Sequence, residues 1–236
     1  MRAQSHVVGV ALMLTLAVVA LGALTAGVGT VLQSQAASAD ADRVATVMDD
    51  ALEGVEQTGY HSYRLTFSEG SLSTEPRTLR VLDANGTVLQ NHSVDALVFE
   101  GNGERVASVG GAVVRGEGSG AWLVSEPPIT GSETNDVLVV GIPVLDAGHV
   151  TVSGRGGTTT TLETNVTHTA TELGRGEFAV AIETATPEPL ERHFEEQNAT
   201  VHRQSFDGDS AESVVARYPG ERSGHVVVHN LSLEVR

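Results

Sequence analysis

The chain has 236 residues and a formal net charge of −16, with 14 arginines, no lysine and no cysteine. This acidic balance argues against nucleic acid as a partner, because phosphate backbones are bound by clustered basic side chains. The absence of cysteine excludes disulfides, thiolate catalysis and cysteine-ligated metals.

The first predicted element is an apolar run over residues 7–32, and no charged residue occurs between Gln4 and Ala39. About 20 apolar residues let a helix cross the hydrocarbon core of a bilayer, so the run predicts a membrane-spanning helix. Two alternatives stay open. The run is an uncleaved signal anchor, or it is a signal peptide removed after Ala39, since Ala37-Ser38-Ala39 has the form of a cleavage site.

The residues that lead into this run, RAQSHVVGVALML, resemble the amino terminus of haloarchaeal type IV pilin-like proteins. In that family a prepilin peptidase cuts after a basic residue followed by a small one, just ahead of the apolar helix. The resemblance implies that Arg2 and Ala3 form this pair and that Gln4 begins the mature chain. It also implies a leader at 1–3 and a transmembrane or filament-core helix at 4–32 that packs among other pilin-like subunits.

Two positions depart from the pattern of the pilin-like proteins. His6 occupies the position where many of them have proline, and Val8 the position of a glutamate that neutralises a neighbouring amino terminus in bacterial pilins. The resemblance covers residues 1–32, and it leaves the bacterial style of filament packing in doubt.

Beyond residue 32 the helical pattern continues as an amphipathic stalk, predicted over residues 33–58. The apolar residues of the stalk recur on one stripe, and Gly59 supplies a stop signal. The stripe consists of Val44, Val47, Met48, Ala51, Leu52 and Val55.

From Tyr60 onward the apolar period changes to two, which predicts a β-rich head over residues 59–236. Asn85-Gly86 predicts a hairpin turn, and Pro187–Gln197 predicts one short helix that begins after Thr186. Strands are expected at 60–68, 78–82, 87–91, 94–100, 104–109, 121–125, 136–142, 147–153, 159–168, 177–183, 199–206, 213–218 and 225–235. The predicted fold class is α+β: a long N-terminal α-helix (membrane span plus stalk), followed by a mainly antiparallel β head. Residues 174–236 as a separate subdomain stay an alternative.

Asparagine usage is unusual, because five of the seven asparagines open an N-x-S/T sequon. A chance origin in a threonine-rich β protein is one interpretation, and N-glycosylation of a domain outside the cell is the other. The candidate sites are Asn85, Asn91, Asn165, Asn198 and Asn230.

No residue pattern predicts catalysis, a cofactor or a metal site, so the chain is not expected to be an enzyme. His225 and His229 are four residues apart in a strand-like run, which separates their side chains by about 13 Å. Asp207-Gly208-Asp209 resembles the start of a calcium loop but lacks its closing glutamate, and a hairpin turn explains it better. Trp122 is expected in the core.

The sequence therefore favours a pilin-like structural protein of the cell surface that is assembled into a filament as a minor component. Its expected partners are the membrane, a prepilin peptidase and other pilin-like subunits, with the N-terminus cytoplasmic and the head outside. The alternative is a single-span ectodomain that does not polymerise and binds a ligand or partner.

Overall fold

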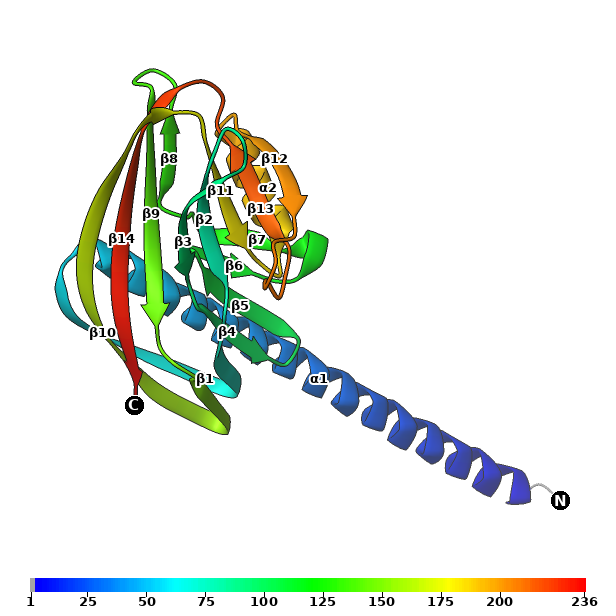
Figure 1. The fold of residues 1–236 in the computed structure, drawn as a ribbon. Helices are drawn as coiled ribbons and strands as arrows, with labels where there is room; N and C mark the ends of the chain where they lie inside the picture. Colours follow the sequence, from blue (N-terminus) through cyan, green and yellow to red (C-terminus); the bar gives the residue numbers. More distant parts are fainter. Residues whose placement is uncertain (1–2) are drawn as a thin grey trace.

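The computed structural model describes residues 3–236; within the first helix, side chains are described for residues 13–16, 18–22 and 33–53. The chain begins with helix α1 (Ala3–Glu53), which is continued by the short 3-10 helix η1 (Gly54–Glu56). Figure 1 shows α1 as a rod whose C-terminal part lies against a β-rich body and whose N-terminal part projects away from it.

The body contains a nine-stranded sheet, here the large sheet, in the order β7-β6-β5-β4-β1-β10-β14-β9-β8. Its pairs are antiparallel except for β14 with β9, which run parallel. Its strands are β1 (Gly59–Glu75), β4 (Ala96–Gly101), β5 (Glu104–Val109), β6 (Ala112–Arg115), β7 (Trp122–Ser125), β8 (Ile129–Ser132), β9 (Val137–Asp146), β10 (Thr151–Gly176) and β14 (Arg222–Val235).

A second sheet of five antiparallel strands, here the small sheet, has the order β12-β13-β11-β2-β3. Its edge strands are therefore β12 and β3. Its strands are β2 (Thr78–Asp83), β3 (Val88–Ser93), β11 (Phe178–Glu183), β12 (Thr200–Gln204) and β13 (Ser213–Arg217). Segment 174–236 contributes strands to both sheets, since β14 lies inside the large one and β11 inside the small one.

The main core lies between the two sheets. Val81 and Val180 of the small sheet are buried in one cluster with Val98 and Val140 of the large sheet. Helix α2 (Pro187–Glu196) adds Leu190 and other apolar side chains to this core, and a second 3-10 helix, η2 (Gly118–Gly120), lies beside it. The opposite face of the large sheet carries α1, so the order of layers is α1, large sheet, small sheet.

Local sequence explains the paths of the long strands. On β1, Leu65 and Phe67 are buried while Arg64 and Thr66 are exposed, as the period of two predicts. Opposite Phe67 and Glu69, strand β10 contains a bulge at the adjacent Gly156 and Gly157, both at positive φ, where glycine is favoured. The sequence pattern predicted two strands here, whereas β10 continues through the bulge.

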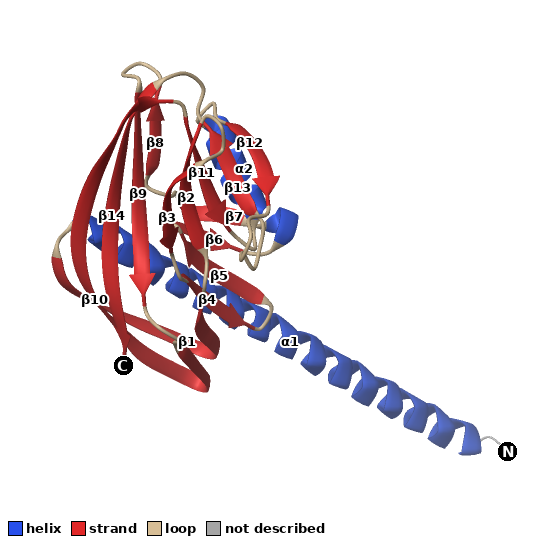
Figure 2. Cartoon of the chain, viewed as in Figure 1, coloured by secondary structure: helices blue, strands red, loops and turns tan. Residues whose placement is uncertain are grey.

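The α+β fold class predicted from the sequence is wrong, because the protein is mainly β. More than half of the described residues lie in strands. Figure 2 shows that strands make up most of the body. The part of α1 and η1 that packs on the body, residues 37–55, covers one face of the large sheet and forms smaller core clusters with it. The sequence pattern also failed to predict strands β6 and β8, because Gly110, Gly111 and Pro128 interrupt the apolar pattern around them.

The predicted membrane span is corrected as well. Among the residues that the structure describes, no helix combines the length and the apolar character needed to cross a bilayer.

Candidate functional site: the exposed segment of helix α1 and the sequons

The C-terminal part of α1, here the docked segment (residues 37–53), is held to the large sheet by an apolar stripe. Ala41, Val44 and Met48 are at most 2% exposed and pack against Leu65 and Phe67 of β1. These helix positions lie three or four residues apart, so they share one face. The stripe predicted from the sequence is therefore confirmed over the docked segment, with Ala41 as an added member.

Asp40 is a polar anchor of the docked segment. Its side chain is 2% exposed, and it accepts a 2.7 Å hydrogen bond from the backbone N–H of Ser68 in β1. The Ser68 hydroxyl donates to the same carboxylate at 3.3 Å, and Arg43 forms an ion pair with it. A buried charge is costly unless it is paired and hydrogen-bonded, so these contacts fix both the depth and the rotation of α1 on the sheet.

Arg115 of β6 provides a second anchor for α1. Its guanidinium donates to the Ser38 hydroxyl at 2.8 Å and forms an ion pair with Asp42. It also pairs with Glu104 at 3.2 Å and lies 5.3 Å from the ring centre of Trp122. Trp122 is 47% exposed, so the prediction that it lies in the core is wrong: its ring covers this guanidinium at the surface.

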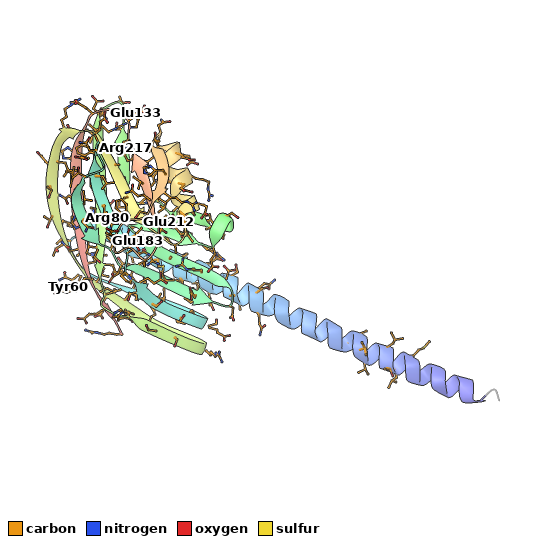
Figure 3. The ribbon with its side chains drawn as sticks, turned by 45° about the vertical axis from the view of Figure 1, so that its right-hand side comes forward. Tyr60, Arg80, Glu133, Glu183, Glu212 and Arg217 are labelled. Carbon is orange, nitrogen blue, oxygen red and sulfur yellow. The ribbon has the colours of Figure 1, made fainter. Side chains whose placement is uncertain are left out.

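Nearer the N-terminus lies the exposed segment of α1, defined as residues 13–16 and 18–22. All described side chains in it are exposed, and the large apolar ones are 62–77% accessible. Figure 3 shows side chains standing out from this part of the rod on more than one side. The large apolar residues are Met13, Leu14, Leu16, Val18, Val19 and Leu21.

These apolar side chains surround the helix instead of forming one stripe. At about 100° per residue, Met13, Leu14 and Val19 point in three directions at least about 100° apart. A helix that is apolar on all sides requires apolar surroundings on all sides, whereas a single partner would cover only one face. Among the described residues, this segment carries half of the large apolar side chains that are exposed, six of twelve.

The predicted processing site lies at the edge of what is described. Arg2 is outside the described residues, and Ala3 and Gln4 belong to the first turn of α1 without described side chains. Cleavage between Ala3 and Gln4 therefore stays a prediction.

The five sequons are accessible to different degrees. Asn85, Asn91, Asn198 and Asn230 are exposed, and Asn165 is half-buried. A glycan can be attached to the folded chain only where the asparagine is accessible. Their use as glycosylation sites stays a prediction.

Three sequons mark the edges of the small sheet. Asn85 and Asn91 lie just before and within β3, and Asn198 lies two residues before β12. The exposed residues of β3 include Val88 and Leu89, each 44% accessible. Unprotected edge strands with apolar residues are prone to pair with other chains, so these are the places where a bulky polar substituent protects most.

The other two sequons lie side by side on the large sheet. Asn165 of β10 is opposite Ser232 of β14, and Thr167 is opposite Asn230, so each asparagine faces the hydroxyl residue of the other sequon. All four line one hollow of about 360 Å³, together with Ser93 from the Asn91 sequon. Sequence spacing cannot reveal this meeting, because 65 positions separate the two asparagines and only the strand register brings them together.

Asp95 also lines this hollow and a second, mainly apolar cavity of about 50 Å³ under the docked segment. Burial raises the pKa of Asp95, and the nearby charge of Asp146 raises it further. The cavity is lined mainly by apolar side chains of the docked segment and of the large sheet.

The sequence motifs considered for metal binding have structural explanations. The hairpin predicted around Asp207-Gly208-Asp209 is confirmed, because this segment joins the antiparallel strands β12 and β13. The carboxylate of Asp209 accepts two hydrogen bonds from the guanidinium of Arg80, at 2.6 and 2.8 Å. Figure 3 labels Arg80 beside Glu183, which accepts hydrogen bonds from the backbone of Ser210 and Ala211.

His229 has a close partner that sequence reasoning missed. His225 and His229 both lie in β14, as predicted, but His229 is paired across the sheet with His168 of β10. Burial lowers the pKa of His229, and the neighbouring His168 lowers it further. The described residues contain no group of three or more histidine, aspartate or glutamate side chains placed to hold a metal ion.

The comparisons with known proteins identify a family. Residues 2–234 match the family of unknown function DUF7289, and the chain belongs to this family. No curated protein and no solved structure matches the chain.

Proposed function

We propose that this member of the DUF7289 family is a pilin-like structural subunit of the cell surface. In this proposal the exposed segment of α1 packs among equivalent helices of neighbouring subunits, and the β body, carrying glycans, faces solvent outside the cell. Assembly as a minor component of a filament fits the large body relative to the single helix.

The observation that carries the proposal is the all-round apolar surface of the exposed segment. Met13, Leu14 and Val19 are 64–77% exposed and point in different directions, so several neighbouring helices are needed to bury them. Burial of apolar area at about 25 cal/mol per Å² is the driving force for such packing. The amino-terminal resemblance to pilin-like proteins supports the same arrangement, with a prepilin peptidase as processing partner.

The rigid attachment of α1 also supports a structural role. Asp40 and Arg115 connect the docked segment to different strands, β1 and β6. A load on the helix is thereby passed to the large sheet through hydrogen bonds as well as through apolar contacts. This is the mechanical property that a subunit of an assembly needs, and no catalytic group is required for it.

Photo-crosslinking in the native cells tests the proposal. Leu16 is replaced by p-benzoylphenylalanine in the full chain, and Glu133, an exposed residue at the far end of the body, is replaced in a matched control. After illumination we expect the Leu16 variant to form covalent products with further copies of the chain or with other helical subunits, and the Glu133 variant to remain monomeric. Products of the Leu16 variant with lipid alone would contradict the proposal.

A further inference from the structure

His168 and His229 form a close pair on the face of the large sheet that carries α1. They are directly opposite each other in the register of β10 and β14. Their Nδ1 atoms are 2.9 Å apart, and their rings are perpendicular, with centroids 4.9 Å apart. This contact is a hydrogen bond in which one ring donates its Nδ1–H to the Nδ1 of the other, and a metal ion that displaces this proton would meet two imidazole ligands.

The nitrogen separation is compatible with coordination of one metal ion by both rings. Imidazole nitrogens bind at about 2.0–2.1 Å, so two ligands at the tetrahedral angle lie about 3.3 Å apart and two at a right angle about 2.9 Å apart. The observed 2.9 Å is close to both values, so a small movement of either side chain brings the two nitrogens to ligand distance. Among divalent first-row ions, copper binds nitrogen ligands most strongly.

The surroundings of the pair favour a cation. His229 lines a hollow of about 320 Å³ beside η1, together with Glu53, Glu56 and Glu126 and with no arginine. Val55 of η1 packs on Val166 and Leu231, which are neighbours of the two histidines on the same face of their strands. The pair is consequently held on two central strands and beside a well-packed helix end, in a negative environment.

We propose that His168 and His229 form a binding site for one Cu²⁺ ion. The two Nδ1 atoms supply two neighbouring ligands, and water occupies the remaining positions, which makes the site open to solvent on the side of the exposed His168. A bound ion would join β10 to β14 at the end of the docked segment. The inference does not depend on the proposed assembly, since it concerns the body alone.

Electron paramagnetic resonance of the full chain in detergent micelles, with Cu²⁺ added up to one equivalent, tests this site. All proteins carry His6→Gln, because a histidine third from a newly formed amino terminus binds Cu²⁺ by itself. We expect one saturable site whose spectrum shows two imidazole nitrogens. His168→Gln and His229→Gln should each lose this signature and weaken binding by more than about tenfold, since even outer-shell partners of metal ligands are worth 10–100-fold.

His225→Gln is the matched control, because His225 lies on the same strand and face as His229 but four residues away. Its copper spectrum and affinity should equal those of the parent. His168 is exposed, so His168→Gln decides the question even if the half-buried His229 cannot be replaced without unfolding. A two-nitrogen spectrum that persists in His168→Gln, or no copper bound by the parent at equimolar metal, would overturn the site.

Discussion

The carboxylate of Asp40 in α1 accepts a 2.7 Å hydrogen bond from the backbone N–H of Ser68 in β1. Ser68 lies at the bulge between Phe67 and Glu69, where that N–H is free of the strand ladder with β10. The carboxylate of Asp40 and the backbone N–H of Ser68 are therefore hydrogen-bond partners near the start of the docked segment. This contact makes α1 a fixed extension of the body.

Asp40→Ala should destabilise the attachment of α1. The change leaves the Ser68 N–H without its partner, which costs about 1–3 kcal/mol in the free energy of unfolding. Urea unfolding of the full chain in detergent micelles measures the loss. Asp50→Ala is the control, because Asp50 is an exposed carboxylate on the same helix and its removal should cost under about 0.5 kcal/mol. Equal effects of the two changes would contradict the anchoring role.

The stability of the body should fall in mild acid because of His193 in α2. Its side chain is 6% exposed, burial lowers its pKa, and the Gln197 side-chain amide lies 2.8 Å from its Nε2. Because the native state disfavours the protonated form, stability is full above the unfolded pKa of about 6.5 and is lost as the pH falls from there towards the lowered native pKa.

His193→Gln should accordingly reduce the slope of Tm against pH between about pH 5 and 7. The slope should not vanish, because burial also lowers the pKa of His92. His202→Gln, at an exposed position of β12, should leave the slope unchanged. A His193→Gln slope equal to that of the parent would show that His193 is not a source of the acid sensitivity.

The sequence predicted local features of the body better than its architecture. The hairpin at Asn85-Gly86 joins β2 to β3, and α2 begins at Pro187 as expected, because both signals depend only on neighbouring residues. Gly86 has a φ of +82°, which a glycine adopts at low cost. Thr186 precedes α2 without forming a side-chain cap, so the fixed φ of Pro187 is the stronger start signal here.

The candidate sites were only partly accessible to sequence reasoning. The sequons could be counted, but the pairing of Asn165 with Ser232 depends on the register of strands far apart in the chain. The same applies to His168 and His229. Fold class was misjudged because the long apolar run dominates the amino-terminal sequence, whereas the two sheets arise from many short segments with weak individual signals.

Loss of the sequons at the edges of the small sheet should promote association of the bodies. Thr87→Ala, Ser93→Ala and Thr200→Ala together remove the sequons of Asn85, Asn91 and Asn198 but keep every asparagine. Without glycans, β3 and β12 can pair with strands of other copies. Light scattering of protein from the native cells should show larger species than the parent does.

The matched control for this prediction is Thr167→Ala with Ser232→Ala, which removes the sequons of the two central strands. Because these strands have no free edge, the control should scatter light like the parent. An edge variant that scatters light no more strongly than the parent would contradict the protective role of these sequons.

Replacement of Ala3 by a bulky residue should block processing of the chain. We propose that the peptidase requires a small residue directly ahead of Gln4. Intact-mass measurement of the protein from native cells should show a chain beginning at Gln4 for the parent and an uncut chain for Ala3→Trp. Gln4→Asn, a conservative change on the other side of the bond, serves as the control and should be cut normally. An unchanged mature mass in Ala3→Trp would argue against the assigned site.

The central claim, that the exposed segment of α1 is buried among like helices, is tested most directly on sheared native cells. The released fraction is examined by electron microscopy with an antibody against residues 59–236. Our account predicts labelled filaments whose subunits retain residues 13–22. Recovery of the body as a freely dissolved monomer that lacks this segment would contradict it.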